Sequence, residues 1–144
     1  MIRWIVIVAA LLGFLSVLVG AFGAHGMESQ LEGQGFSAED IAKKIDQCEV
    51  AVRYQMFHVL AILALGLMGQ DACPKKRVVA TVFFLLGITA FSGGLYSMVF
   101  LDLMGHWSIV PLGGLCFMVG WICLILVGLD KSMLETQGSG EVAG

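Results

Sequence analysis

Four apolar runs, each about 20 residues long and separated by short connections, constrain this chain more than any other feature. About 20 residues of α-helix cross the hydrocarbon core of a bilayer, which is roughly 30 Å thick. Composition agrees, because 58% of the 144 residues are hydrophobic and only 13% are charged, whereas about 25% of the residues in soluble domains are charged. A globule of this size cannot bury so much apolar surface. We therefore expect an all-α membrane protein whose surroundings are the lipid bilayer.

The four runs are expected to form an antiparallel four-transmembrane-helix bundle, because short connections make successive helices neighbours. The longest connection, residues 26–49, is expected to lie outside the membrane, and its Ser37 followed by two acidic residues is typical of a helix N-cap. A cleaved signal peptide is an alternative for the first run, although its apolar stretch exceeds the usual length of about 7–15 residues. The expected single domain covers residues 1–131, with spans at about 2–24, 50–69, 78–101 and 108–129 and a disordered tail over residues 132–144.

The basic residues are divided unequally between the two ends of this bundle. One end holds five of them, and the other holds three that are diluted by the acidic residues of the 26–49 connection. Since Lys and Arg near span ends favour the cytoplasmic side, we expect a protein of the cell (inner) membrane with both termini in the cytoplasm. The end with the termini carries Arg3, Lys75, Lys76, Arg77 and Lys131, and the opposite, outer end carries Lys43, Lys44 and Arg53.

Small residues recur at helical spacing in three of the four runs. In lipid the hydrophobic effect does not draw helices together, so small residues mark the faces where helix backbones approach. The second run instead has polar groups on the corresponding face, and we expect them to fill the interior. The small-residue stripes are Ala9, Gly13, Ser16, Gly20 and Gly23 in the first run, Gly87, Ala90, Gly94 and Ser97 in the third, and Gly113, Cys116, Gly120 and Cys123 in the fourth.

Polar side chains gather at the outer end in this topology. Polar groups inside a span are costly to desolvate, so they are functional hypotheses by default. We expect the histidine that closes the first run to share a hydrogen-bond network with the polar face of the second run, facing the bundle interior. The candidate cluster consists of His25, Arg53, Tyr54, Gln55, His58 and His106.

Simpler roles remain open for several of these residues. Arg53 is placed to pair with Glu49 one helical turn earlier. His58 is placed to bond one turn back on its own helix, to Tyr54, or to a neighbouring helix. Aromatic residues near the span ends, such as Tyr96, are typical of an interfacial aromatic belt, and Trp107 has the same simple interpretation.

The sequence gives little support to metal, haem, catalytic or nucleic-acid chemistry. Three histidines at one end could coordinate a divalent ion, and His25 with His58 could bind a haem, but no two ligands are concentrated on one helix. We expect no cofactor and no metal. An enzyme is not expected either, because no nucleophile elbow and no carboxylate pair lies within a span. The net charge of −3 leaves no basic surface for a nucleic acid.

Each of the four runs carries a distinctive motif. These are GAFGAH at residues 20–25, RYQMFH at 53–58, FSGGLY at 91–96, and PLGG with GW at 111–114 and 120–121. In this order they resemble the YgdD-like family, domain-of-unknown-function family 423, which includes the transmembrane protein 256 relatives of animals. The resemblance implies a small multi-pass membrane protein and implies no reaction, substrate or cofactor. Since the 26–49 connection is longer and more charged than the family leads us to expect, no role is carried over to it.

These observations favour a non-enzymatic integral membrane protein that acts as a scaffold or accessory subunit. Its polar cluster would organise the bundle or meet a partner, which would be a second copy of the chain or another membrane protein. The main alternative is a small transporter or channel that works as an oligomer, because four helices packed on small residues leave little room for a pore in one protomer. A membrane protein that binds metal or haem through the outer-end histidines is the third alternative.

Overall fold

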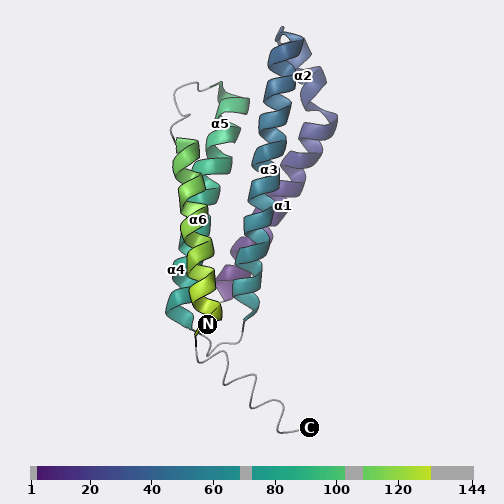
Figure 1. Ribbon diagram of the computed structural model, residues 1–144. Coiled ribbons are helices and arrows are strands. Elements are labelled where there is room, and N and C mark those ends of the chain that lie inside the picture. Colours follow the sequence, from purple (N-terminus) through teal and green to yellow (C-terminus); the bar gives the residue numbers. More distant parts are fainter. Residues whose placement is uncertain (1–2, 69–72, 103–108, 131–144) are drawn as a thin grey trace.

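The computed structural model describes residues 3–68, 73–102 and 109–130, and every regular element in these ranges is a helix (Figure 1). Four helical segments are long and apolar enough to cross a membrane, which confirms the expected all-α membrane fold. The expected tail, His106, Trp107 and Lys131 lie outside the described residues. The elements are α1 (Arg3–His25), α2 (Met27–Gly33), α3 (Ala38–Leu67), α4 (Pro74–Gly87), η1 (Ile88–Ser92), α5 (Gly93–Leu101) and α6 (Ile109–Gly128).

The connection between the first two spans is largely helical. Ser37 is the N-cap of α3, as expected, and its Oγ accepts a hydrogen bond from the backbone N–H of Asp40 at 3.2 Å. With 30 residues, α3 is about 45 Å long, so its first turns extend beyond a hydrocarbon core of roughly 30 Å. There the short helix α2 covers α3, with Leu31 of α2 and Ile41 of α3 in one apolar cluster. The sequence did not predict α2.

The bundle consists of two antiparallel helix pairs placed side by side. In one pair α1 packs along α3, and in the other α6 packs along α4 and η1. The pairs meet mainly where α3 contacts η1 and α5, so α1 and α6 lie on the flanks. Only 17% of the most apolar stretch of α1 and of α6 is buried, compared with 39% for α3. The flanking helices therefore present most of their surface to lipid. The first turn of α1 and the last turn of α6 lie at the same end of the bundle (Figure 1).

The third span is a single continuous helix with a π-helical turn in its middle. It begins at Pro74, a residue favoured in the first helical turn, so the cluster Lys75 to Arg77 lies inside the helix rather than in the expected connection over residues 70–77. The π-helical turn η1 joins α4 to α5, and such turns insert an extra residue into the helical repeat. Ser92 at its end is buried, and its Oγ donates a hydrogen bond to the backbone oxygen of Ala51 in α3 at 2.9 Å.

Two buried basic side chains cap helix C-termini at opposite ends of the bundle. Arg77 is 0% exposed, and its Nε donates to the backbone oxygen of Leu65 in the last turn of α3 at 2.9 Å. At the outer end Lys44 donates to the backbone oxygen of Val99 at 3.2 Å and pairs with Asp102 at 3.0 Å, at the end of α5. Cations stabilise helix C-termini because the last carbonyls carry partial negative charge. Arg77 and Lys44 therefore each hold the C-terminal end of a helix in place. This structural role is additional to the charge that each contributes to its end of the bundle.

Candidate functional site

The register of α1 against α3 decides which of the candidate residues can meet. A Cβ added at Gly23 would lie 3.5 Å from Cys48 Sγ, and one added at Gly13 would lie 3.5 Å from Val59. These pairs place His25 of α1 level with α3 residues about three turns before His58, which is a separation of roughly 18 Å along the helix. The structure therefore does not bring His25 to His58. His25 is exposed at the end of α1.

Gln55 is the residue that joins three helices. Its side chain is only 4% exposed, and its Nε2 donates a hydrogen bond to the backbone oxygen of Leu12 in α1 at 2.9 Å. Its Oε1 accepts a hydrogen bond from the hydroxyl of Tyr96 in α5 at 3.0 Å. Tyr96 is therefore an interior hydrogen-bond donor, and the interpretation of this residue as part of an interfacial belt is wrong.

His58 joins α3 to α6. Its ring is 5% exposed, its Nδ1 lies 2.7 Å from the backbone oxygen of Tyr54, and its Nε2 lies 3.1 Å from Nε1 of Trp121. A carbonyl oxygen can only accept and an indole N–H can only donate. The ring must therefore carry its proton on Nδ1 and accept at Nε2, which is the neutral imidazole. Both ring nitrogens are used.

Aromatic rings surround the imidazole on the remaining sides. The ring of Phe117 stacks on His58 with centroids 3.5 Å apart and planes 5° apart, and the ring of Phe84 lies 5.5 Å away. Tyr54 packs against Phe91 with ring centroids at 4.8 Å. We call these eight residues the central cluster; its members are Tyr54, Gln55, His58, Phe84, Phe91, Tyr96, Phe117 and Trp121. Its aromatic rings pack in the interface between the two helix pairs.

The central cluster lies near the middle of the bundle and not at its outer end. Leu12 is close to the midpoint of α1, and Trp121 is close to the midpoint of α6. The expected outer-end position followed from starting the second span at Val50. Because α3 begins at Ala38 and its first turns extend beyond the bundle, Gln55 and His58 lie about halfway across.

Of the remaining candidates, Arg53 lies away from this cluster, and Tyr54 lies at its exposed edge. Arg53 is exposed and pairs loosely with Glu49 at 3.8 Å, which confirms the simpler role expected for it. Tyr54 is 42% exposed, and it contributes its backbone oxygen and one face of its ring. His106 lies outside the residues that the structure describes.

Sequence reasoning missed two of the important partners in the interior. Trp121 belongs to the GW motif, but its spacing gives no sign that its indole reaches α3. Ser92 belongs to the FSGGLY motif and was given no role in the packing, whereas its hydroxyl bonds to α3. Backbone acceptors such as the oxygen of Leu12 carry no side-chain signal at all, so the contact that Gln55 makes with α1 could not be found from residue types.

The buried polar groups already have partners within the protein. Among residues 3–68, 73–102 and 109–130, every buried side-chain nitrogen or oxygen has a hydrogen-bond partner. In the same ranges no group of three or more His, Cys, Asp or Glu is placed to hold a metal ion. A haem iron at His58 would have to displace the indole of Trp121. The central cluster is therefore well suited to hold helices together.

The comparison with family models identifies the group of proteins to which the chain is related. Residues 19–114, which are 96 of the 144 residues, match the family described as Protein of unknown function (DUF423). The chain belongs to this family. The resemblance seen in the four motifs is thus confirmed, and the match includes Gln55, His58 and Tyr96 of the central cluster.

Individual relatives of the DUF423 chain are membrane proteins of bacteria. This chain is 36% identical over 121 residues to a UPF0382 membrane protein of Staphylococcus saprophyticus. The alignment covers 84% of this chain and 92% of the relative. The chain is 35% identical over 126 residues, 88% of each chain, to the UPF0382 inner membrane protein YgdD of Escherichia coli strain K12. A UPF0382 membrane protein of Haemophilus influenzae is 37% identical over 115 residues, with 80% and 85% coverage. No solved structure matches the chain. The chain is an integral membrane protein.

Proposed function

We propose that this protein is a non-enzymatic scaffold or accessory subunit of the cell membrane, whose central cluster fixes the helices so that the flanking helices can meet a partner. The main support is the way in which Gln55 and His58 use their hydrogen-bonding atoms. Together they bond to α1, α3, α5 and α6. A group that binds substrate or reacts needs an open position, whereas these groups are occupied by neighbouring helices.

The same contacts argue against a transport path through one protomer. Phe84 and Phe117 are 0% and 4% exposed and lie against His58 at the middle of the bundle. A solute crossing there would have to separate α3 from α6 and break the bond between His58 and Trp121. A transporter or channel built from this chain would therefore need a path between protomers, and it remains the alternative function.

Partners would meet the flanking helices, where large apolar side chains are exposed. Phe14 of α1 is 64% exposed and Met118 of α6 is 56% exposed. A photoreactive phenylalanine analogue at each position, in cells, tests for a protein neighbour within the membrane. We expect a discrete crosslinked protein band from at least one of the two faces, either a second copy or another membrane protein. The analogue at Phe84, which is buried, is the matched control and should give none.

Crosslinks to lipid alone from both faces would contradict the scaffold role. The transporter alternative would then be favoured if the purified protein, reconstituted in vesicles, released a trapped ion or small solute. The two functions are therefore distinguished by the same protein preparation.

We also propose that both termini lie in the cytoplasm. Of the basic residues at the end with the termini, Arg3, Lys75 and Lys76 are exposed there, and Lys76 pairs with Asp130 at 2.6 Å. The outer end exposes Lys43 and Arg53 among many carboxylates. The excess of exposed cations supports the cytoplasmic assignment.

Single cysteines test this orientation in a chain whose four native cysteines are replaced by alanine. Glu32→Cys on α2 and Lys75→Cys on α4 are both at exposed positions. We expect an impermeant maleimide to label only the Glu32→Cys chain in intact cells, and to label both chains after the membrane is permeabilised. Labelling of Lys75→Cys alone in intact cells would mean that the orientation is inverted.

A further inference from the structure

The contact between α1 and α3 opens into a groove near the outer end. A cavity of about 290 Å³ lies between the two helices there. Small and apolar residues line it, including Gly20 and Gly23 of α1 and Val52 of α3. Glu49 and Arg53 stand at its rim with side chains that are 64% and 59% exposed. The groove is thus lined by apolar side chains and has charged side chains at its outer edge.

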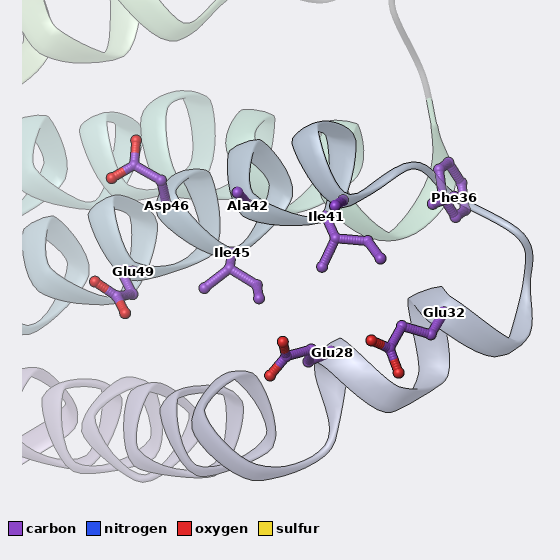
Figure 2. Close-up of a pocket in the computed structure, with 9 residues that line it drawn as sticks. Glu28, Glu32, Phe36, Ile41, Ala42, Ile45, Asp46 and Glu49 are labelled. Atoms are coloured by element: carbon purple, nitrogen blue, oxygen red, sulfur yellow. The ribbon is translucent and has the colours of Figure 1, made fainter.

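A second cavity continues the groove outward. It has a volume of about 510 Å³, lies between α2 and α3, and shares Ile45 and Glu49 with the first cavity. Figure 2 shows Glu28 and Glu32 of α2 turned toward the gap that Ile45 and Glu49 face from α3. The second cavity therefore has an apolar floor and four carboxylates around it, from Glu28, Glu32, Asp46 and Glu49. We call the two cavities together the α1–α3 groove.

The charges of the groove follow an order along α3. Gly20 of α1 is level with Val52, next to Arg53 on α3. Because helical side chains lean toward the N-terminus of their helix, the Arg53 guanidinium lies outward of Gly20. Glu49 lies one turn before Arg53 on α3, about 5.4 Å further out. The ion pair between them is 3.8 Å long, whereas charge-assisted hydrogen bonds are about 2.7–2.9 Å long. Arg53 and Glu49 therefore each retain capacity for a ligand. Apolar, positive and negative groups follow one another from the membrane outward.

We propose that the α1–α3 groove binds one phospholipid with a primary-amine headgroup, of the phosphatidylethanolamine type, from the leaflet at this end. The order of groups in this lipid is acyl chain, phosphate and ammonium, which is complementary to the order in the groove. The acyl chain lies inward of the headgroup, beginning beside Gly20, the phosphate accepts hydrogen bonds from Arg53, and the ammonium donates to Glu49 and Glu28. This inference requires the membrane location of the chain and does not depend on the scaffold role.

The carboxylates select the headgroup. A primary ammonium has N–H donors for three carboxylates, whereas the quaternary ammonium of a choline lipid has none. A glycerol headgroup carries no cation, so its lipid would leave the carboxylates uncompensated beside the phosphate. An amine phospholipid is therefore expected to bind more tightly than either.

Native mass spectrometry of the purified full-length protein tests the groove itself. With added phosphatidylethanolamine we expect one retained lipid per chain, and roughly tenfold weaker retention of phosphatidylglycerol. Ala24→Leu fills the groove from α1 and should abolish retention. Ala10→Leu makes the same change at another exposed position of α1 and should leave retention unchanged. Equal retention by the two variants would overturn the proposal, as would equal retention of the two lipids by the unmodified chain.

Charge variants test the headgroup without changing the packing of α1. The double variant Glu28→Gln and Glu32→Gln should retain lipid but lose the preference for the amine headgroup. Arg53→Gln should weaken retention of both lipids, whereas Lys43→Gln, exposed on the same helix outside the groove, should have no effect. An unchanged headgroup preference in the glutamate variant would overturn the assignment of the ammonium to these carboxylates.

Discussion

The two helix pairs both carry glycine stripes, but they use them differently. In the pair of α1 and α3, a Cβ added at Gly13 or Gly20 would lie 3.5 or 3.4 Å from a valine of α3, which is ordinary contact. In the pair of α4 to α5 with α6, a Cβ at Gly113 or Gly120 would overlap Phe91 or Phe84. Along these glycine stripes the second pair is therefore in much closer contact than the first.

The difference depends on what lies opposite each glycine. Rings of phenylalanine fill the spaces over Gly87 and Gly120, and the backbone of Phe91 rests on Gly113. Two of these phenylalanines, Phe84 and Phe117, are also the rings that lie against His58. The close approach of α6 therefore builds the wall of the central cluster, whereas the looser contact of α1 leaves the α1–α3 groove. A glycine stripe therefore indicates which face of a helix is packed. How closely the helices approach there depends on the residues opposite the glycines.

Among the substitutions that test this difference between the helix pairs, Gly113→Ala is expected to have the largest effect on stability. In Gly113→Ala the new methyl would meet backbone atoms of Phe91 in η1, which cannot rotate away. We expect a loss of about 3 kcal/mol in the free energy of unfolding. The measurement is unfolding of the purified protein by titration with a denaturing detergent, followed by circular dichroism.

The adjacent glycine provides the matched control for this change. A Cβ at Gly114 would meet nothing within 4 Å, so Gly114→Ala should leave the free energy of unfolding unchanged within about 0.5 kcal/mol. Equal losses from the two variants would show that helix 109–128 is sensitive to added methyl groups in general, and the close contact with η1 would lose its support.

A smaller effect is expected at the bond that joins the two pairs. Gln55→Leu removes the acceptor for Tyr96 and the donor to Leu12, and Tyr96→Phe removes the hydroxyl alone. Interhelical hydrogen bonds in membranes contribute about 0.6 kcal/mol on average and about 1.7 kcal/mol at most. We expect a coupling energy of about 1 kcal/mol between the two positions in a double-mutant cycle.

The control for this cycle pairs Gln55→Leu with an exposed hydroxyl that makes its hydrogen bond within its own helix. Thr89 donates to the backbone oxygen of Leu85 in its own helix, so Thr89→Val should show no coupling to Gln55→Leu. Coupling of the same size at Thr89 would mean that the cycle reports a general loosening of the bundle.

Much of the fold could be predicted from residue patterns, but the register between helices could not. Hydropathy identified four spans and Ser37 identified the start of α3, because both signals are local. An apolar run does not say how far its helix extends past the membrane. For that reason the central cluster was placed at the outer end, and His25 was expected to reach His58, from which it is about three turns away.

The partners in the interior were also beyond sequence reasoning, for a physical reason. Gln55 and His58 were identified as interior polar residues because unpaired polar groups in hydrocarbon are costly. Their partners on other helices are a carbonyl oxygen in α1, a tyrosine hydroxyl and an indole N–H. Such partners are chosen by distance and direction in the folded bundle, and spacing along one helix does not encode them.

The smallest effect is expected at Gly20, where the stripe of α1 crosses α3. The added methyl in Gly20→Ala would make ordinary contact with Val52 at 3.4 Å, and alanine is the better helix former. We expect the free energy of unfolding to change by no more than about 0.5 kcal/mol, measured by the same titration as for Gly113→Ala. Gly66→Ala belongs to the same helix pair, but its methyl would lie 2.8 Å from Val6. It should therefore be clearly more destabilising than Gly20→Ala. If Gly20→Ala instead matched Gly113→Ala, the two helix pairs would be equally close, and the α1–α3 groove would have no basis in a looser contact.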